Sequence, residues 1–278
     1  MLRAFGWYLI GICRLLDSVG FWILESSFEV HQRQFEATAM VMSGALAIAG
    51  SDTEVGKTVT VLALAAYWQQ HWRDRGRLGL FKPVQSGVGD REVYSELFAD
   101  LDQSADSFNP IQLKAPLAPP IAADLEGRSI DLGLAWRSFV ALQADRSLVL
   151  VEGAGGLGSP LTWELTFADL VADWRLPLVL VVPVKLGSIA QAVANVALAR
   201  QHQIPLRGIV LNEVRPLAAD DRATLAPASL IQTLTNVPVL GYLPYLRDWR
   251  DRSALASAAA QLDLERLFPA IGAAHAAV

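Results

Sequence analysis

The feature that most constrains this chain is a short glycine-rich loop that joins an apolar run to a helical stretch. The loop covers residues 50–58 and reads GSDTEVGKT, with five residues between its glycines. Backbone N–H groups at such a helix N-terminus point at an anion, and the helix dipole contributes about half a positive charge. The loop therefore predicts a phosphate site, in which Lys57 reaches the β- and γ-phosphates of a nucleotide and the Thr58 hydroxyl ligates Mg²⁺. The alternative is a chance Gly-Lys-Thr sequence at the start of a helix.

The rest of the chain alternates short apolar runs with helical stretches, a pattern that indicates βαβ units and a parallel sheet. The predicted strands are 45–49, 78–81, 148–151, 178–182, 209–211 and 239–243, and the clearest predicted helices are 57–70, 188–201 and 254–267. Residues 102–130, which are richer in proline and polar residues, are expected to form irregular cover. Since there is neither an internal repeat nor an interdomain linker, we expect one α/β domain over 42–278.

Composition and charge narrow the function classes. Hydrophobic residues make up 53% and charged residues 18% of the 278 residues, which excludes a disordered chain and allows a large core. The formal net charge of −5 argues against general nucleic-acid binding, which needs a basic surface. The single cysteine, Cys13, excludes a disulfide framework and a thiolate metal site. We therefore expect a cytoplasmic protein that binds no nucleic acid.

Residues 1–41 differ from the remainder and are expected to form a separate N-terminal extension. Their longest uncharged stretch, Ala4–Cys13, is too short to cross a bilayer, so no membrane partner is expected. Three interpretations remain open. Translation starts at Met40 or Met42 and the extension is not made, or the extension is an amphipathic segment for an interface or a partner. In the third, residues 37–39, Ala-Thr-Ala, are an export cleavage site, although they lie far from the apolar stretch.

Polar residues follow two further predicted strands. Lys82 opens the sequence KPVQSG, and Glu152 opens the sequence EGAGG. Open α/β sheets bind ligands at the carboxyl ends of their strands, so both segments are expected beside the phosphate loop. A carboxylate there can hold Mg²⁺, a hard cation that prefers oxygen ligands, and the glycines allow a close approach of the backbone. Taken singly, Lys82 can also be an ordinary solvated charge, and EGAGG an ordinary glycine-rich turn.

Five motifs in a fixed order connect these segments. They are the loop SDTEVGKT, KPVQSG at 82–87, EGAGG with Pro160, VKLG at 184–187, and Asn212 followed by LGYLP at 240–244. In this order and spacing the chain resembles the dethiobiotin synthetase family over roughly residues 44–265. The resemblance implies a three-layer fold of the P-loop NTPase type, with a mostly parallel sheet and helices on both faces.

The resemblance also implies an ATP- and Mg²⁺-dependent ring closure in biotin biosynthesis. One amine of 7,8-diaminononanoate takes up CO₂, supplied by bicarbonate, as a carbamate. The carbamate oxygen attacks the γ-phosphate of ATP, which gives ADP and a carbamic–phosphoric anhydride. The second amine closes the urea ring and expels phosphate, so that dethiobiotin is released.

Roles for individual residues follow from the same resemblance. Lys57 and Lys82 are the catalytic lysines, because the attack of one anion on another requires positive charge between them. Asp90 and Glu152 join Thr58 as the Mg²⁺ ligands, although Asp90 on its own could be a solvated loop residue. The ATP-binding residues implied are Glu54, Val55, Gly56, Lys57, Thr58, Val59, Asp90, Glu152, Gly153, Ala154, Gly155, Asn212, Glu213, Pro244, Tyr245 and Leu246.

The resemblance assigns the other substrates as well. Ser86 and Thr53 are expected to hydrogen-bond the carbamate or the diamine, and Asn212 to recognise adenine through paired amide hydrogen bonds. Residues 185–187, Lys185, Leu186 and Gly187, are expected to reach the substrate of a neighbouring subunit, which implies a homodimer with shared sites.

Two other enzyme or ATPase classes use a similar loop. An amidoligase of cobalamin synthesis also activates a carboxylate, but it carries a glutaminase domain with a nucleophilic cysteine, and here the only cysteine is Cys13. A partition- or targeting-type switch ATPase usually has an extra lysine near the start of the loop, where Ala49 and Ser51 flank Gly50 in this chain. ATP turnover that depends on a diamine distinguishes the enzyme from the switch.

Overall fold

The computed structural model describes residues 44–218 and 220–268, so the extension expected over 1–41 lies outside the described residues. The strands are β1 (Ala45–Gly50), β2 (Leu78–Phe81), β3 (Val84–Ser86), β4 (Ile111–Leu113), β5 (Leu148–Gly156), β6 (Leu178–Pro183), β7 (Leu206–Asn212) and β8 (Val239–Leu243). Six of them form a sheet in the order β2-β5-β1-β6-β7-β8, in which every neighbouring pair is parallel. The strands β3 and β4 form a separate parallel pair.

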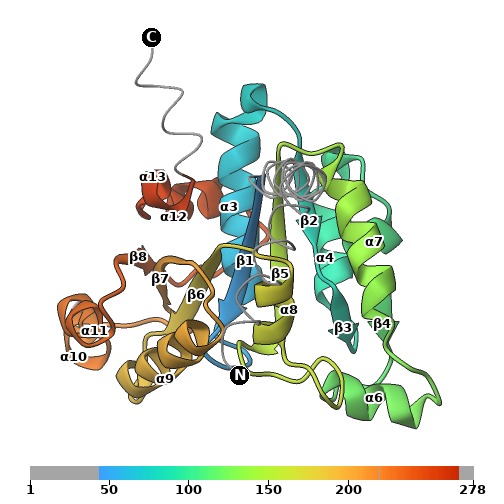
Figure 1. Ribbon diagram of the computed structural model, residues 1–278. Helices are drawn as coiled ribbons and strands as arrows, with labels where there is room; N and C mark the ends of the chain where they lie inside the picture. The colour runs from blue at the N-terminus through green and yellow to red at the C-terminus, as the bar shows by residue number, and fades with distance from the viewer. Residues whose placement is uncertain (1–43, 219, 269–278) are drawn as a thin grey trace, which may run out of the picture. The chain divides into compact units, whose positions relative to one another are not determined.

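Helices cover both faces of the six-stranded sheet (Figure 1). They are α3 (Lys57–His71), α4 (Asp90–Leu97), α5 (Ala105–Phe108), α6 (Pro119–Leu125), α7 (Leu132–Gln143), α8 (Phe167–Asp173), α9 (Ser188–Gln201), α10 (Asp221–Leu225), α11 (Ala228–Thr235), α12 (Arg252–Ala259) and α13 (Leu264–Leu267). Short 3₁₀ turns lie at Arg73–Arg75 and Ala99–Leu101. Among the described residues, no helix combines the length and the hydrophobicity that a membrane span requires.

The apolar strands are buried on both sides because successive side chains point to opposite faces. On β6, Val179 and Val181 join the core cluster that contains residues of α3 and α12, whereas Leu180 and Val182 join the cluster that contains residues of α9 and α11. On β2, Leu80 packs in the first cluster, and Phe81 turns to the other face, where its ring meets Phe139 of α7. The continuous apolar runs of the sequence therefore mark central strands of a three-layer domain.

Most predicted elements are confirmed, with their order, but two expectations are wrong in part. Residues 102–130 are not irregular throughout, because they contain α5, β4 and α6. Prolines at 119 and 120 stand in the first turn of α6, where the missing N–H costs nothing. The predicted helix 254–267 is interrupted at Asp263, whose N–H donates to the carbonyl of Leu240 and whose side chain caps α13.

The sheet order fixes where the site lies. The central strand β1 has β5 on one side and β6 on the other, so the order of the strands reverses at β1. Ligands bind at such a switch point, outside the carboxyl ends of the strands. The loop 50–58 follows β1 and residues 185–187 follow β6, so both lie at this edge of the sheet (Figure 1). The predicted end of the third strand at 151 is wrong, because β5 continues to Gly156; Glu152 therefore lies within β5, paired with Ile48 of β1.

Candidate active site

The loop 50–58 turns tightly between β1 and α3. Two of its residues adopt left-handed backbone angles, Glu54 with φ 55° and Gly56 with φ 91°. Only glycine fits at position 56, since any Cβ there would also clash with the side-chain amide of Asn212. The loop is closed on its other side by β5, because a Cβ at Gly156 would lie 3.3 Å from the Cα of Asp52. The sequence EGAGG thus permits close packing of two backbones.

Helix α9 holds the first half of the same loop. The Ser51 hydroxyl donates to the side-chain carbonyl of Gln191 at 3.2 Å, and the Asn195 amide donates to the Ser51 carbonyl at 3.2 Å. The Gln191 amide in turn donates to the carboxylate of Asp52 at 3.3 Å. The phosphate loop therefore keeps its shape through contacts with β5, Asn212 and α9.

Lys57 begins α3 and points back into the loop. Its side chain is buried, and its Nζ donates to the carbonyl of Asp52 at 3.3 Å. Burial lowers the pKa of the Lys57 ammonium, and the carboxylate of Glu152 offsets only part of this effect. The ammonium is thus held in the curve of the loop, without a carboxylate hydrogen bond among the described residues.

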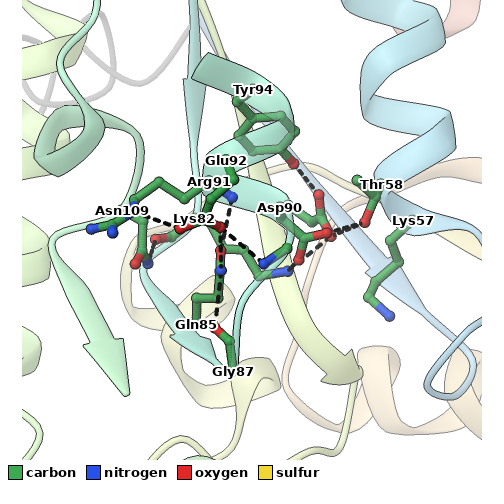
Figure 2. Close-up of polar contacts among 12 residues, drawn as sticks. Lys57, Thr58, Lys82, Gln85, Gly87, Asp90, Arg91, Glu92, Tyr94 and Asn109 are labelled. Atoms are coloured by element: carbon green, nitrogen blue, oxygen red, sulfur yellow. Dashed lines mark hydrogen bonds and ion pairs between the residues drawn. The ribbon is translucent and has the colours of Figure 1, made fainter. Parts of the chain in front are cut away.

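A second buried lysine lies between two carboxylates (Figure 2). Lys82 follows β2, and its Nζ donates to Glu152 Oε1 at 3.0 Å and to Asp90 Oδ2. Burial by itself lowers the pKa of Lys82, but the charges of Glu152 and Asp90 outweigh it and raise the pKa above its usual value. Burial conversely raises the pKa of Asp90, and the Lys82 ammonium more than reverses this. Since a buried charge needs a partner, Lys82 and Asp90 each hold the other in the charged form.

The Thr58 hydroxyl lies against the same two carboxylates. Its Oγ1 is 2.8 Å from Asp90 Oδ1 and 2.9 Å from Glu152 Oε1. One hydroxyl and two carboxylates form an oxygen donor set of the kind that binds Mg²⁺, a cation that usually keeps several waters and takes one or two carboxylates from the protein. The three side chains are therefore close enough together to share one metal ion.

Tyr94 completes this cluster from α4 (Figure 2). It is fully buried, and its hydroxyl donates to Glu152 Oε2, the oxygen that neither Lys82 nor Thr58 contacts. Burial raises the pKa of the Tyr94 hydroxyl well above its usual value, and the charge of Glu152 raises it further. The hydroxyl is therefore a fixed donor. Sequence reasoning missed Tyr94, although its place one helical turn after Asp90 was a signal.

The cluster lines the larger of two cavities near the phosphate loop. This cavity has a volume of about 740 Å³, and Lys57, Lys82, Thr58, Asp90 and Glu152 all contribute to its wall. Its other walls include four further residues predicted to bind ATP or the diamine, namely Thr53, Glu54, Ala154 and Gly155. Ser86 also lines it, with a buried hydroxyl that makes no hydrogen bond among the described residues. The cavity is large enough for phosphates and a small organic substrate.

A smaller cavity of about 340 Å³ lies on the other side of the loop. Of the residues predicted to bind ATP, it is lined by Glu54, Gly56, Val59, Asn212, Glu213, Pro244, Tyr245 and Leu246. The Asn212 amide donates to the Val55 carbonyl at 2.9 Å, while its buried Oδ1 accepts no hydrogen bond from the described residues. Arg247 and Trp249 also line this cavity and were missed, because nothing in the sequence separates them from other surface residues.

Some residues predicted to bind ATP or the diamine do not line the cavity walls in the expected way. Val55 is buried in the core and lines neither cavity, and Gly153 packs against Phe167. Glu213 forms an ion pair with Arg222 and accepts the N–H of Tyr245 at 3.2 Å, so it holds the cavity wall. Residues 185–187 line neither cavity, and Leu186 between β6 and α9 is 88% exposed.

Known proteins match the chain over most of its length. A family described as an AAA domain matches residues 44–253. The ATP-dependent dethiobiotin synthetase BioD of Gloeothece citriformis is 55% identical over 225 residues, which are 81% of this chain and 99% of that protein. The protein of the same name from Gloeobacter violaceus is 47% identical over 224 residues, which are 81% and 95% of the two chains. The chain belongs to the dethiobiotin synthetase family.

Membership of this family confirms the predicted enzyme class, an ATP-dependent ligase. A solved chain of the MinC:MinD cell division protein complex of Aquifex aeolicus is similar in fold, with a TM-score of 0.51 and 12% identity. The match covers 82% of this chain and 96% of that one, and at this identity it shows the fold alone. The predicted P-loop NTPase fold is thereby confirmed.

Replacing either of the two buried lysines should change the free energy of unfolding by a different amount. Replacing Lys82 in Lys82→Met leaves Asp90 and Glu152 without a counter-ion, so the free energy of unfolding should fall by about 3 kcal/mol. Lys57→Met removes an ammonium without a carboxylate hydrogen bond and should change it by less than about 1 kcal/mol. Urea unfolding at pH 7 without divalent metal measures both, and equal losses would contradict the counter-ion role of Lys82.

Proposed function

We propose that this chain closes 7,8-diaminononanoate with CO₂ to dethiobiotin, at the expense of ATP and with the help of Mg²⁺. The relatives that carry the dethiobiotin synthetase name support the reaction. One observation supports the assignment of roles to individual residues. Two buried lysines and two carboxylates line the larger cavity together with the phosphate loop. No other described cavity combines a phosphate loop with these charges.

The chemistry explains why two lysines are needed. The carbamate and the γ-phosphate are both anionic, so the carbamate oxygen can attack only if positive charge lies between them. We assign Lys57 in the loop to the phosphates, and Lys82 after β2 to the carbamate and the transferred group. Both lysines line the same cavity, which supports a shared role in this step.

The proposed metal ligands are Thr58, Asp90 and Glu152. The Thr58 hydroxyl lies 2.8 Å from Asp90 Oδ1 and 2.9 Å from Glu152 Oε1, and this donor set suits Mg²⁺. When bound there, Mg²⁺ would neutralise charge that develops between the β- and γ-phosphates. We assign Ser86 to the diamine or its carbamate, because its buried hydroxyl has no partner in the described protein. Thr53 is assigned to the same substrate.

Product formation tests the proposed reaction directly. The full-length chain is supplied with ATP, Mg²⁺, bicarbonate and 7,8-diaminononanoate, and dethiobiotin is detected by mass. We expect the product only when all four components are present, and equal amounts of ADP and phosphate. A folded chain that binds ATP but forms no dethiobiotin would contradict the proposed substrate.

We further propose that the smaller cavity holds the nucleoside and that Asn212 recognises adenine. Its orphaned Oδ1 is placed to accept a hydrogen bond from the 6-amino group, and Pro244, Tyr245 and Leu246 form the neighbouring wall. Inosine presents an acceptor instead of this amine, so it would leave the amide oxygen unpaired. Leaving a buried acceptor unpaired costs about 1–3 kcal/mol.

In the Asn212→Ala variant, the preference for ATP over ITP should therefore fall by about 10-fold or more. The measurement is kcat/KM with each nucleotide. Asn195→Ala is the matched control, because Asn195 also donates to a carbonyl of the phosphate loop but lies outside the smaller cavity. It should affect ATP and ITP equally, and an unchanged preference in Asn212→Ala would remove the adenine role.

A homodimer with shared sites is the part of the proposal that residues 185–187 support. They line neither cavity of their own chain, and Leu186 is almost fully exposed at the edge of the sheet where ligands bind. A large apolar side chain in this position is suited to contact the diamine bound by a second copy. Two further predictions accompany the homodimer: the protein is located in the cytoplasm, and residues 42–278 form the catalytic domain.

Mixing two inactive variants tests the shared site. Lys57→Ala disables the phosphate loop of its own chain, and Leu186→Asp disables the contact made to the neighbour. In an equal mixture with free exchange of subunits, half of the pairs are mixed and each has one intact site, so about a quarter of the sites should recover. Activity that stays at the level of the separate variants would contradict a site shared between two copies.

A further inference from the structure

We propose that Tyr94 is a positioning residue, which fixes the Glu152 carboxylate so that only one of its oxygens can serve a metal ion. The proposal rests on the metal ligands assigned above. It adds a residue that touches neither nucleotide nor substrate, and that acts through Glu152.

The contacts of Glu152 separate its two oxygens. Oε1 lies 2.9 Å from the Thr58 hydroxyl and 3.0 Å from the Lys82 ammonium, so it is the oxygen that faces the proposed metal ligands and Lys82. Oε2 accepts the Tyr94 hydroxyl instead. The Glu152 side chain is only 1% exposed, so these protein contacts account for most of its surroundings. The orientation of the Glu152 carboxylate group is thus fixed, and only Oε1 points towards Thr58.

Helix α4 joins Tyr94 to the second carboxylate. Asp90 is the first residue of α4, and Tyr94 follows four positions later on the same face of the helix. The start of the helix is fixed, because Glu92 accepts the N–H of Gly89 at 2.9 Å. The Arg91 N–H also donates to the Gln85 side chain at 2.9 Å (Figure 2). One anchored helix therefore sets both Asp90 and, through Tyr94, Glu152.

Packing keeps the Tyr94 hydroxyl in place. The ring is fully buried in the core cluster, and its centre lies 5.9 Å from that of Phe108 in α5. An ordinary core tyrosine would need only some acceptor for its hydroxyl. Here the acceptor is a carboxylate of the proposed metal site, and groups that orient a metal ligand in this way affect metal affinity by about 10- to 100-fold.

The test uses the full chain and Mn²⁺ as the probe metal. Binding of Mn²⁺ in the presence of ADP is measured from the electron paramagnetic resonance signal of the Mn²⁺ that stays free. Tyr94→Phe keeps the ring and removes only the hydroxyl. We expect it to weaken Mn²⁺ binding by about 10- to 100-fold, while the affinity for ADP without metal stays unchanged. The Mg²⁺ concentration for half-maximal turnover should rise in parallel.

Tyr242→Phe is the matched control, because the Tyr242 hydroxyl donates to the Ala226 carbonyl at 2.9 Å, not to a carboxylate. It should lose stability without a change in Mn²⁺ affinity. If Tyr94→Phe fails to fold, 4-fluorophenylalanine at position 94 fills the space of the hydroxyl without donating. Restored affinity with 4-aminophenylalanine, which donates, would support the positioning role.

The outcomes separate this inference from the metal site on which it rests. If the unaltered chain with ADP binds Mn²⁺ tightly and Tyr94→Phe binds it equally well, the role of Tyr94 is wrong and the ligands stand. If the unaltered chain binds no more Mn²⁺ than ADP alone does, the ligand assignment and the role of Tyr94 are both overturned.

Discussion

The ammonium of Lys82, held between Glu152 and Asp90, is the interaction on which the site depends. Two carboxylates placed close together in a protein interior repel each other, and one of them would take up a proton if no cation were present. Lys82 supplies positive charge to both carboxylates, and it does so from the end of a strand that neighbours β5 in the sheet. A charged centre can therefore exist beside the phosphate loop because the pairing of β2 with β5 brings Lys82 next to Glu152.

The backbone around this centre is equally constrained. Gly56 takes a left-handed conformation directly below Asn212, and the glycines after Glu152 let β5 approach the loop. Helix α9 holds Ser51 and Asp52 from the opposite side. These protein contacts fix the shape of the loop, and a loop that the protein itself holds in order loses less entropy when phosphates bind.

The sequence predicted those parts of the fold and site that depend on local pattern. Apolar runs marked the central strands, and the polar residues directly after the runs 45–49, 78–81 and 148–151 pointed to the loop with Lys57, to Lys82 and to Glu152, although β5 continues past Glu152 to Gly156. Asp90 was harder to place, because only tertiary packing brings the start of α4 to the ends of these strands. Tyr94, Arg247 and Trp249 were missed for the same reason, since their neighbours come from distant segments. The short helices of 102–130 depend on caps and prolines that an average composition conceals.

The contact between Asn212 and the loop has a consequence for attempts to redesign this protein. The same side-chain amide donates to the Val55 carbonyl and occupies the space above Gly56. A larger residue at 212 would collide with the loop, and a smaller one would free it, so a change of nucleotide preference made at this position would also alter phosphate binding. Among the described residues, the wall at 244–246 makes no hydrogen bond to the loop, so it is the better starting point for laboratory evolution towards another base.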